Sequence, residues 1–241
     1  MKLAAPLFAT CSALALCAAT ATAAEVTLTL DPAAGGTNQA DFTVETPGFP
    51  PLSDSSDVSG TLDADVSFSG GLPSMIEFLP TSDLGFTDVL ITVSVGGSTV
   101  EVARTENVRG TVTSGPLSVD AAGNIDLTGS VLTLDEGLVG FLGDDPSNNE
   151  LSGNPIVLVL DAGSTGTLTS NDLGGGLREL VLSSDIVFTG RVDENPIIDL
   201  TVSGTLVARG TVAIPEPTAF AGLAAGLCVM SLRRRRAVGR R

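Results

Sequence analysis

The chain has 241 residues and a formal net charge of −16, with 28 acidic residues against 12 basic ones and no histidine. Between Glu25 and Ile214 the imbalance is larger, because 27 acidic residues face five arginines, for a formal net charge of −22. A surface of this sign repels nucleic acid and anionic lipid, so no nucleic acid is expected as a partner.

The segment from Glu25 to Ile214 also lacks lysine, histidine, tyrosine, tryptophan and cysteine. This excludes Ser-His-Asp and Cys-His nucleophiles, zinc sites built from His or Cys, Schiff-base lysines and haem ligation by His or Cys. We therefore expect no cofactor and a protein that is not an enzyme. Without a cysteine pair, stability must come from burial and backbone pairing.

The N-terminus has the pattern of a secretory signal peptide. Met1-Lys2 is a positive start, residues 3–19 are apolar, and Ala21-Thr22-Ala23 fits the small-x-small rule for cleavage. We expect residues 1–23 to be removed. Residues 24–213 are then long enough for one sizeable core, and a single domain is expected.

Apolar and polar residues alternate with a period of two through residues 24–213, which predicts strands buried on one face. No amphipathic helix is predicted there. In chain order, the positions expected to be buried are Val26, Leu28 and Leu30; Phe42 and Val44; Val58, Leu62, Ala64, Val66 and Phe68; Val89, Ile91, Val93 and Val95; Val100 and Val102; Val108 and Val112; Ile125 and Leu127; Leu132 and Leu134; Leu180, Leu182, Ile186 and Phe188; and alternate residues from Ile198 to Val212.

Glycines predict where these strands turn. Gly70-Gly71 ends a strand, and Gly96-Gly97 is a two-residue link typical of a hairpin, so adjacent strands are expected to be antiparallel. The alternation changes phase at Gly129-Ser130, for which we expect a bulge. Residues 156–160 are apolar on both faces, as in a central strand.

Four glycines, Gly60, Gly110, Gly204 and Gly210, fall on the buried face, where a missing side chain lets a strand coil sharply. The last strand would span roughly 50 Å if straight, so it should bend. The sequence therefore predicts an all-β, single antiparallel domain, either a curled β-sandwich or a partly closed barrel. We expect Leu, Val and Ile to fill its interior.

Two groups of carboxylates are candidate sites. Asp144, Asp145, Asn148 and Glu150 offer oxygen ligands for Ca²⁺ in the longest loop, but their spacing is not that of an EF-hand, and a solvated acidic loop with no metal is the preferred interpretation. Asp63 and Asp65 could stand about 7 Å apart on one strand, as glycosidase carboxylates can. Alternation alone produces such pairs, so we expect no catalytic residue.

The C-terminal segment has three parts. Pro215, Glu216 and Pro217 form an extended triplet that cannot continue a helix or a central strand. Residues 219–232 are uncharged and end at a basic block made of Arg233, Arg234, Arg235 and Arg236. As a helix this run is roughly 21 Å long against about 30 Å of hydrocarbon, which predicts a short transmembrane anchor with the arginines on the cytoplasmic side.

This order of triplet, apolar run and basic end resembles the PEP-CTERM sorting signal of Gram-negative bacteria. The resemblance covers residues 214–241 only. It implies that exosortase, a membrane-embedded cysteine transpeptidase, recognises Pro215, Glu216 and Pro217 and detaches the protein for export. Basic residues continue to Arg241, beyond the family's usual short block. The alternative is an ordinary C-terminal anchor.

Together these features predict an exported, non-enzymatic protein with a structural or interaction role. It would be tethered on the periplasmic side of the inner membrane and then reach the cell surface or extracellular matrix. Its expected partners are an exosortase-type transpeptidase, the inner membrane and extracellular polysaccharide. One alternative is a secreted binding module for an apolar ligand, a polysaccharide or Ca²⁺. Another is a carboxylate-based hydrolase, which needs two or three carboxylates converging in one cleft with raised pKa values.

Overall fold

The computed structural model describes residues 22–30, 38–48, 50–142, 150–194 and 197–214. Every regular element among them is a β-strand, and none of these residues belongs to a helix that could cross a bilayer. The all-β, antiparallel expectation is therefore confirmed for this part of the chain. The expected C-terminal helix and residues 1–21 of the expected signal peptide lie outside it.

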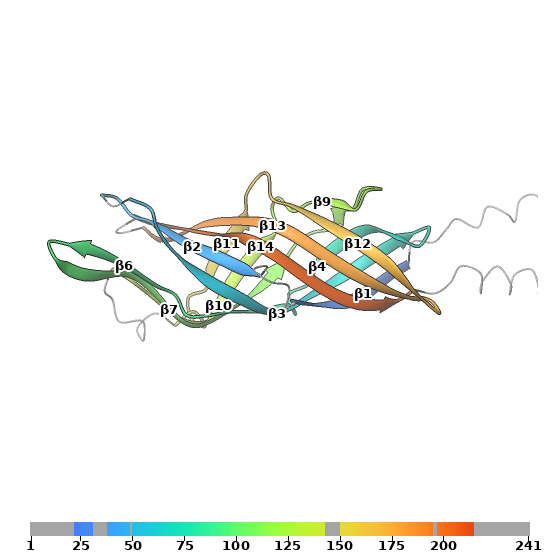
Figure 1. The fold of residues 1–241 in the computed structure, drawn as a ribbon, viewed down its shortest axis with the longest axis horizontal. Helices are drawn as coiled ribbons and strands as arrows, with labels where there is room; N and C mark the ends of the chain where they lie inside the picture. The colour runs from blue at the N-terminus through green and yellow to red at the C-terminus, as the bar shows by residue number, and fades with distance from the viewer. Residues whose placement is uncertain (1–21, 31–37, 49, 143–149, 195–196, 215–241) are drawn as a thin grey trace, which may run out of the picture.

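In the part of the chain that the structure describes, fourteen antiparallel strands form one sheet (Figure 1). They are β1 (Thr22–Leu30), β2 (Gln39–Glu45), β3 (Leu52–Ser69), β4 (Leu72–Phe78), β5 (Asp83–Phe86), β6 (Leu90–Val95), β7 (Ser98–Thr113), β8 (Leu117–Ser118), β9 (Asn124–Asp126), β10 (Val131–Phe141), β11 (Ile156–Leu160), β12 (Thr165–Gly174), β13 (Leu177–Glu194) and β14 (Ile197–Ala213).

The sheet closes on itself. The path β14-β2-β3-β5-β7-β10-β11-β13 ends beside its first strand, because β13 pairs with β14 along nearly its whole length. The sequence left a curled sandwich or a partly closed barrel open, and the observed pairings run around a ring. The ring is elongated, with the strands inclined to its long axis (Figure 1).

A second closed path uses the same three long strands at the other end of the ring. There β14 pairs with β1, β1 with β3, β3 with β4, and β4 with β8. The bridge Val119–Ile125 then leads to β9, which pairs with β12, and β12 pairs with β13. Strands β3, β13 and β14 thus run the length of the molecule, and the shorter strands fill the gaps between them.

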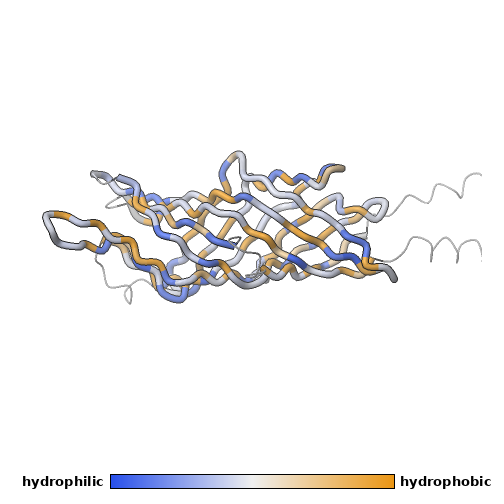
Figure 2. The backbone as a smooth tube through the Cα atoms, in the orientation of Figure 1, coloured by the Kyte–Doolittle hydropathy of each residue, from blue (hydrophilic) through white to orange (hydrophobic). Residues whose placement is uncertain are grey.

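The interior is one apolar cluster built from alternate residues of the strands. Nearly all the positions expected to be buried are buried, including Leu28, Val66, Leu132, Leu180 and Val202. Figure 2 shows apolar residues recurring along every long strand rather than gathering in one segment. The exceptions are Val93, Gly204 and Gly210, which are half-buried, and Val95 and Val100, which are exposed because their hairpin leaves the ring.

One local expectation was wrong, the bulge at Gly129-Ser130. The phase change at Gly129-Ser130 is a turn between β9 and β10, in which Ser130 N–H donates to Leu127 O, and not a bulge. The bulges of β10 lie further on, on either side of Glu136. Strand β11 is central, between β10 and β13, as expected. Its outward side chains Val157 and Val159 are exposed because no described residue covers the outer face of the ring there.

Close backbone approaches occur at inward glycines, as expected. A Cβ at Gly204 in β14 would lie 3.0 Å from Ala40 Cα and closer still to Gln39 O in β2. At this point along β14 the paired strand changes from β1, at Ala208 and Arg209, to β2, at Asp199 to Thr205. Asn38, at a positive φ of 70°, fills the junction, and its side-chain oxygen accepts a hydrogen bond from Val207 N–H. The glycine lets two strands meet where the ring closes.

Both ends of the described chain lie at one end of the ring. Thr22 pairs with Phe68 next to the β3–β4 turn, and Ile214 N–H donates to Gly176 O in the β12–β13 turn at 2.7 Å. The β6–β7 hairpin projects from the opposite end (Figure 1). The molecule therefore has one end from which the chain enters and leaves and one that points away.

Candidate functional site

The interior has little room for a ligand. A cavity among the core side chains has a volume of about 30 Å³ and is lined almost wholly by aliphatic and phenylalanine side chains, among them Leu62, Phe86, Leu132, Leu182 and Val202. Pockets that hold small molecules have volumes of roughly 300–1,000 Å³. The aliphatic filling expected from the sequence accounts for this interior.

A polar groove lies on the outer face instead, over β9, β12 and β13. Its volume is about 590 Å³. We call it the acidic groove, and it is lined by Asp120, Asn124, Ile125, Asp126, Gly163, Thr165, Gly166, Thr167, Ser183 and Asp185. Carboxylates and hydroxyls dominate this lining, so its chemistry suits a hydroxyl-rich or cationic ligand rather than an apolar one.

The β8–β9 turn forms one wall of the acidic groove and is organised by Asp120. Asp120 Oδ1 accepts from the backbone N–H groups of Ala122 and Asn124, each at 2.8 Å, and Oδ2 accepts from Asn124 Nδ2 at 2.8 Å. These hydrogen bonds, with that from the Asn124 side chain foremost, lower the pKa of Asp120 from its ordinary value. The carboxylate is a structural acceptor.

The other carboxylates of the acidic groove are also engaged. Asp126 accepts from Thr128 N–H at 3.0 Å, and hydrogen bonds from the Thr128 side chain and backbone lower the pKa of Asp126. Asp185 accepts from Thr205 Oγ1 at 2.8 Å. A general acid needs a raised pKa, so the lowered pKa values of Asp120 and Asp126 do not suit either residue to that role.

The hydrogen bonds to Asp120 predict a pH-dependent contribution to stability. Because the pKa of Asp120 is lower in the folded chain than in the unfolded one, its contribution is present above the unfolded pKa of about 3.9 and is lost as pH falls through the folded value. We expect Asp120→Asn to lower the urea midpoint at about pH 6 but to match the wild type at about pH 2. Urea unfolding at both pH values tests this.

Asp65→Asn is the control for Asp120→Asn. It changes the net charge equally, but Asp65 lies beside Glu25 and Glu77 in register, so its removal relieves repulsion. We expect it not to lower the urea midpoint at about pH 6. An Asp120→Asn deficit of the same size at both pH values would contradict the role of the charge.

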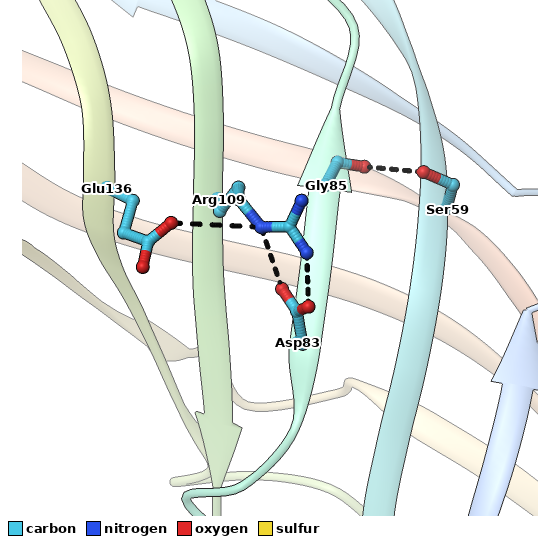
Figure 3. Close-up of polar contacts among 5 residues, drawn as sticks. All are labelled: Ser59, Asp83, Gly85, Arg109 and Glu136. Atoms are coloured by element: carbon cyan, nitrogen blue, oxygen red, sulfur yellow. Dashed lines mark hydrogen bonds and ion pairs between the residues drawn. The ribbon is translucent and has the colours of Figure 1, made fainter.

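An ion cluster links three other strands on the outer face (Figure 3). Arg109 of β7 donates from Nε to Asp83 Oδ1 of β5 at 2.9 Å and from Nη2 to Asp83 Oδ2, while Glu136 Oε2 of β10 lies 3.8 Å from Nε. The hydrogen bonds with Asp83 raise the pKa of Arg109. All three side chains are about half exposed or more, so the cluster fastens the short strand β5 to β7 and offers no enclosed site.

The described surface has no unpaired guanidinium group. Each of its five arginines contacts a carboxylate: Arg104 with Glu106, Arg109 with Asp83, Arg178 with Asp172, Arg191 with Asp199, and Arg209 with Glu179. Many carboxylates remain, and several accept from hydroxyls of the next strand, as Asp63 does from Thr27 and Asp161 from Thr189. The outer face is therefore broadly negative.

Among the described residues, the carboxylates that the sequence suggested as candidate sites do not line the interior cavity or the acidic groove. Asp63 and Asp65 point outward from β3 and line neither the interior cavity nor the acidic groove. Glu150 is exposed and pairs through its backbone with Leu138. Asp144, Asp145 and Asn148 lie outside the described residues, as do Pro215, Glu216, Pro217 and Arg233 to Arg236. No cluster of three acidic residues able to hold a metal occurs in the part of the chain that the structure describes.

The sequence reasoning missed the acidic groove. Its residues come from three segments, near 120, 165 and 185, that only strand pairing brings together. One signal was available, because the run Asp120-Ala121-Ala122-Gly123-Asn124 is typical of a turn in which an Asp side chain caps backbone donors.

No family model and no curated protein matches the chain.

Proposed function

We propose that this is an exported, non-enzymatic surface or matrix protein, held for a time at the inner membrane by its C-terminal segment and released by an exosortase-type transpeptidase. Residues 1–23 direct export, and residues 214–241 are the sorting tail. The folded part is then a rigid, acidic, hydrated body with a structural or interaction role outside the cytoplasm.

The position of Thr22 and Ile214, the first and last described residues, is the observation that best supports this proposal. Thr22 and Ile214 lie at one end of the ring, so a tether attached there leaves the whole body free to point away from the membrane. Cleavage after Ala23 would leave seven of the nine residues of β1. Those seven include Val26, Leu28 and Leu30, which reach the core, so removal of the signal is compatible with the ring.

A binding module is the second candidate, and the acidic groove favours a polar ligand for it. The interior cavity of about 30 Å³ argues against an apolar ligand of ordinary size. Polysaccharide remains the better alternative, although the described phenylalanines offer no fully exposed stacking platform. Phe42, Phe68, Phe78, Phe86 and Phe188 are buried, and Phe141 is partly buried against the core.

Intact mass of the protein from its native host tests the sorting proposal. The expected product begins near Ala24 and has lost the residues that follow Pro217. Glu216→Gln is expected to keep Arg233 to Arg241 and to stay in the membrane fraction, because the charged centre of the recognition triplet is gone. Glu45→Gln, the same change on an exposed glutamate of β2, should be processed like the wild type. Surface-exposed protein that retains Arg241 would count against the proposal.

A further inference from the structure

The β6–β7 hairpin is an uncharged projection from a highly charged molecule. Residues 89–100 contain no acidic or basic side chain, whereas Asp88 and Glu101 flank them directly. The hairpin extends beyond the ring at the end opposite Thr22 and Ile214, the first and last described residues (Figure 1). With a formal net charge of −22 on residues 25–214, this tip is a place where two such bodies can approach with little repulsion.

One face of the hairpin is an exposed apolar strip that continues from the core. Ile91 and Val102 are buried at its base, and Val93 lies half-buried opposite Val100. Towards the tip, Val100 is 41% exposed and Val95 is 53% exposed. Figure 2 shows the apolar colour along this projection. Exposed aliphatic side chains gathered in this way are typical of a contact surface.

The outer edge of β6 presents backbone groups for pairing. Among the described residues β6 pairs with β7 alone. Val95 and Ser98 flank the two-residue Gly96-Gly97 turn and form its hydrogen-bonded pair, so alternation directs the N–H and C=O groups of Thr92 and Ser94 away from β7. β-Branched residues without charge or proline make an edge prone to pair with another strand.

The opposite edge of the hairpin is less suited to pairing. By the same alternation, Thr99 and Glu101 direct their backbone groups outward from β7, and Glu101 places a carboxylate there. Two copies joined along β7 would bring two carboxylates close together. Along β6 the strand itself, Leu90 to Val95, contains no charge. The Asp54 carboxylate of β3 accepts from Leu90 N–H at 3.2 Å at the base of the hairpin, which leaves the outward groups of Thr92 and Ser94 for pairing.

We infer that β6 is a self-association edge whose partner is β6 of a second copy of this chain. The two strands pair antiparallel about a two-fold axis at Val93, so that Thr92 of each copy forms a hydrogen-bonded pair with Ser94 of the other. The apolar strip then runs across a four-stranded sheet made of both hairpins. The ring bodies lie at opposite ends of this joint, which keeps their negative charges apart.

The charge of the two bodies and the small size of the contact determine how the dimer should respond to protein concentration and to salt. Two strands of six residues make a small contact, so the dimer depends on concentration. Salt screens the repulsion between the bodies, so the dimer fraction should rise with NaCl. An association held by ion pairs would weaken instead, and a fall in the dimer fraction with NaCl would overturn the assignment.

Cysteine cross-linking tests the position of the axis. In the full chain in mild detergent, with Cys11, Cys17 and Cys228 changed to Ser, Val93→Cys places two thiols on the axis. Directly opposite residues of a pair that is not hydrogen-bonded have Cα atoms about 4.5 Å apart, within disulfide reach. Val95→Cys is the matched control. In the dimer, residue 95 of one copy faces residue 91 of the other, so the two copies of residue 95 stand roughly 13 Å apart. We expect a disulfide dimer from Val93→Cys only. No dimer from Val93→Cys, or equal yields from both, would overturn the proposal.

Proline substitution tests which edge is used. Ser94→Pro removes an outward N–H without breaking the β6–β7 ladder, since proline is tolerated at a strand edge. Thr99→Pro, directly across the hairpin, does the same to the β7 edge. In sedimentation velocity we expect Ser94→Pro to lose the dimer and Thr99→Pro to retain it, with circular dichroism confirming folded protein. The reverse result would overturn the choice of β6.

Discussion

Replacing Leu180 by alanine is expected to lower the free energy of unfolding by about 2–5 kcal/mol. Leu180 lies in β13 with its side chain 0% exposed, and β13 is one of the three strands that run through both closed paths. The substitution leaves a cavity that surrounding backbone pairing keeps from collapsing. For a body of this size the melting temperature should fall by roughly 5–15 °C, measured by thermal denaturation with circular dichroism.

Leu177→Ala is the matched control for Leu180→Ala. Leu177 is the first residue of β13, and its side chain is 47% exposed. The same atoms are removed from the same strand, but little apolar surface returns to water. We expect a change within about 0.5 kcal/mol. Equal losses from the two variants would mean that the interior does not account for stability.

Gly204→Ala should have the second large effect, a loss of roughly 3 kcal/mol. The added Cβ would meet Gln39 O and Ala40 Cα, which are backbone atoms of β2 and cannot rotate away. Either β2 must separate from β14 or β14 must lose its sharp coil. Because the φ of Gly204 lies outside the left-handed region, the cost comes from space rather than from backbone strain. Chemical denaturation of the purified variant measures it.

Gly115→Ala is the control for Gly204→Ala. Nothing lies within 4 Å of a Cβ placed at Gly115, and its φ is also outside the left-handed region. We expect stability to be unchanged, or raised by about 0.5 kcal/mol because the unfolded chain loses freedom. If Gly204→Ala were as neutral as Gly115→Ala, the close approach of β14 and β2 would not constrain the ring.

Local periodicity predicted the buried face of most strands but not the limits of burial. Val93, Val95 and Val100 obey the alternation and still leave the core, because their hairpin extends past the end of the ring. Val157 and Val159 are apolar and exposed because no second layer from the described residues covers β11. A period of two shows which residues share a face but not whether anything lies against that face.

The candidate sites show a similar division. The turn capped by Asp120 could be anticipated from five consecutive residues, whereas its position beside Thr165 and Asp185 depends on pairing between strands far apart in the chain. Asp63 and Asp65 could be assigned to the same face, but their neighbours Thr27, Glu25 and Glu77 could not. The identity of a residue gives little information about which distant strand will pair with its own strand.

By itself the sequence determined that the body of this protein is all-β and antiparallel, which side of most strands is buried, where two of its hairpins turn, and that its surface is acidic. These properties follow from alternation, glycine conformation and composition, which act over a few residues. Only the tertiary structure decided that the strands close into a ring, that Thr22 and Ile214 lie at the same end of it, and that an uncharged hairpin projects from the other end. Those features rest on backbone hydrogen bonds between distant segments, which almost any side chain permits.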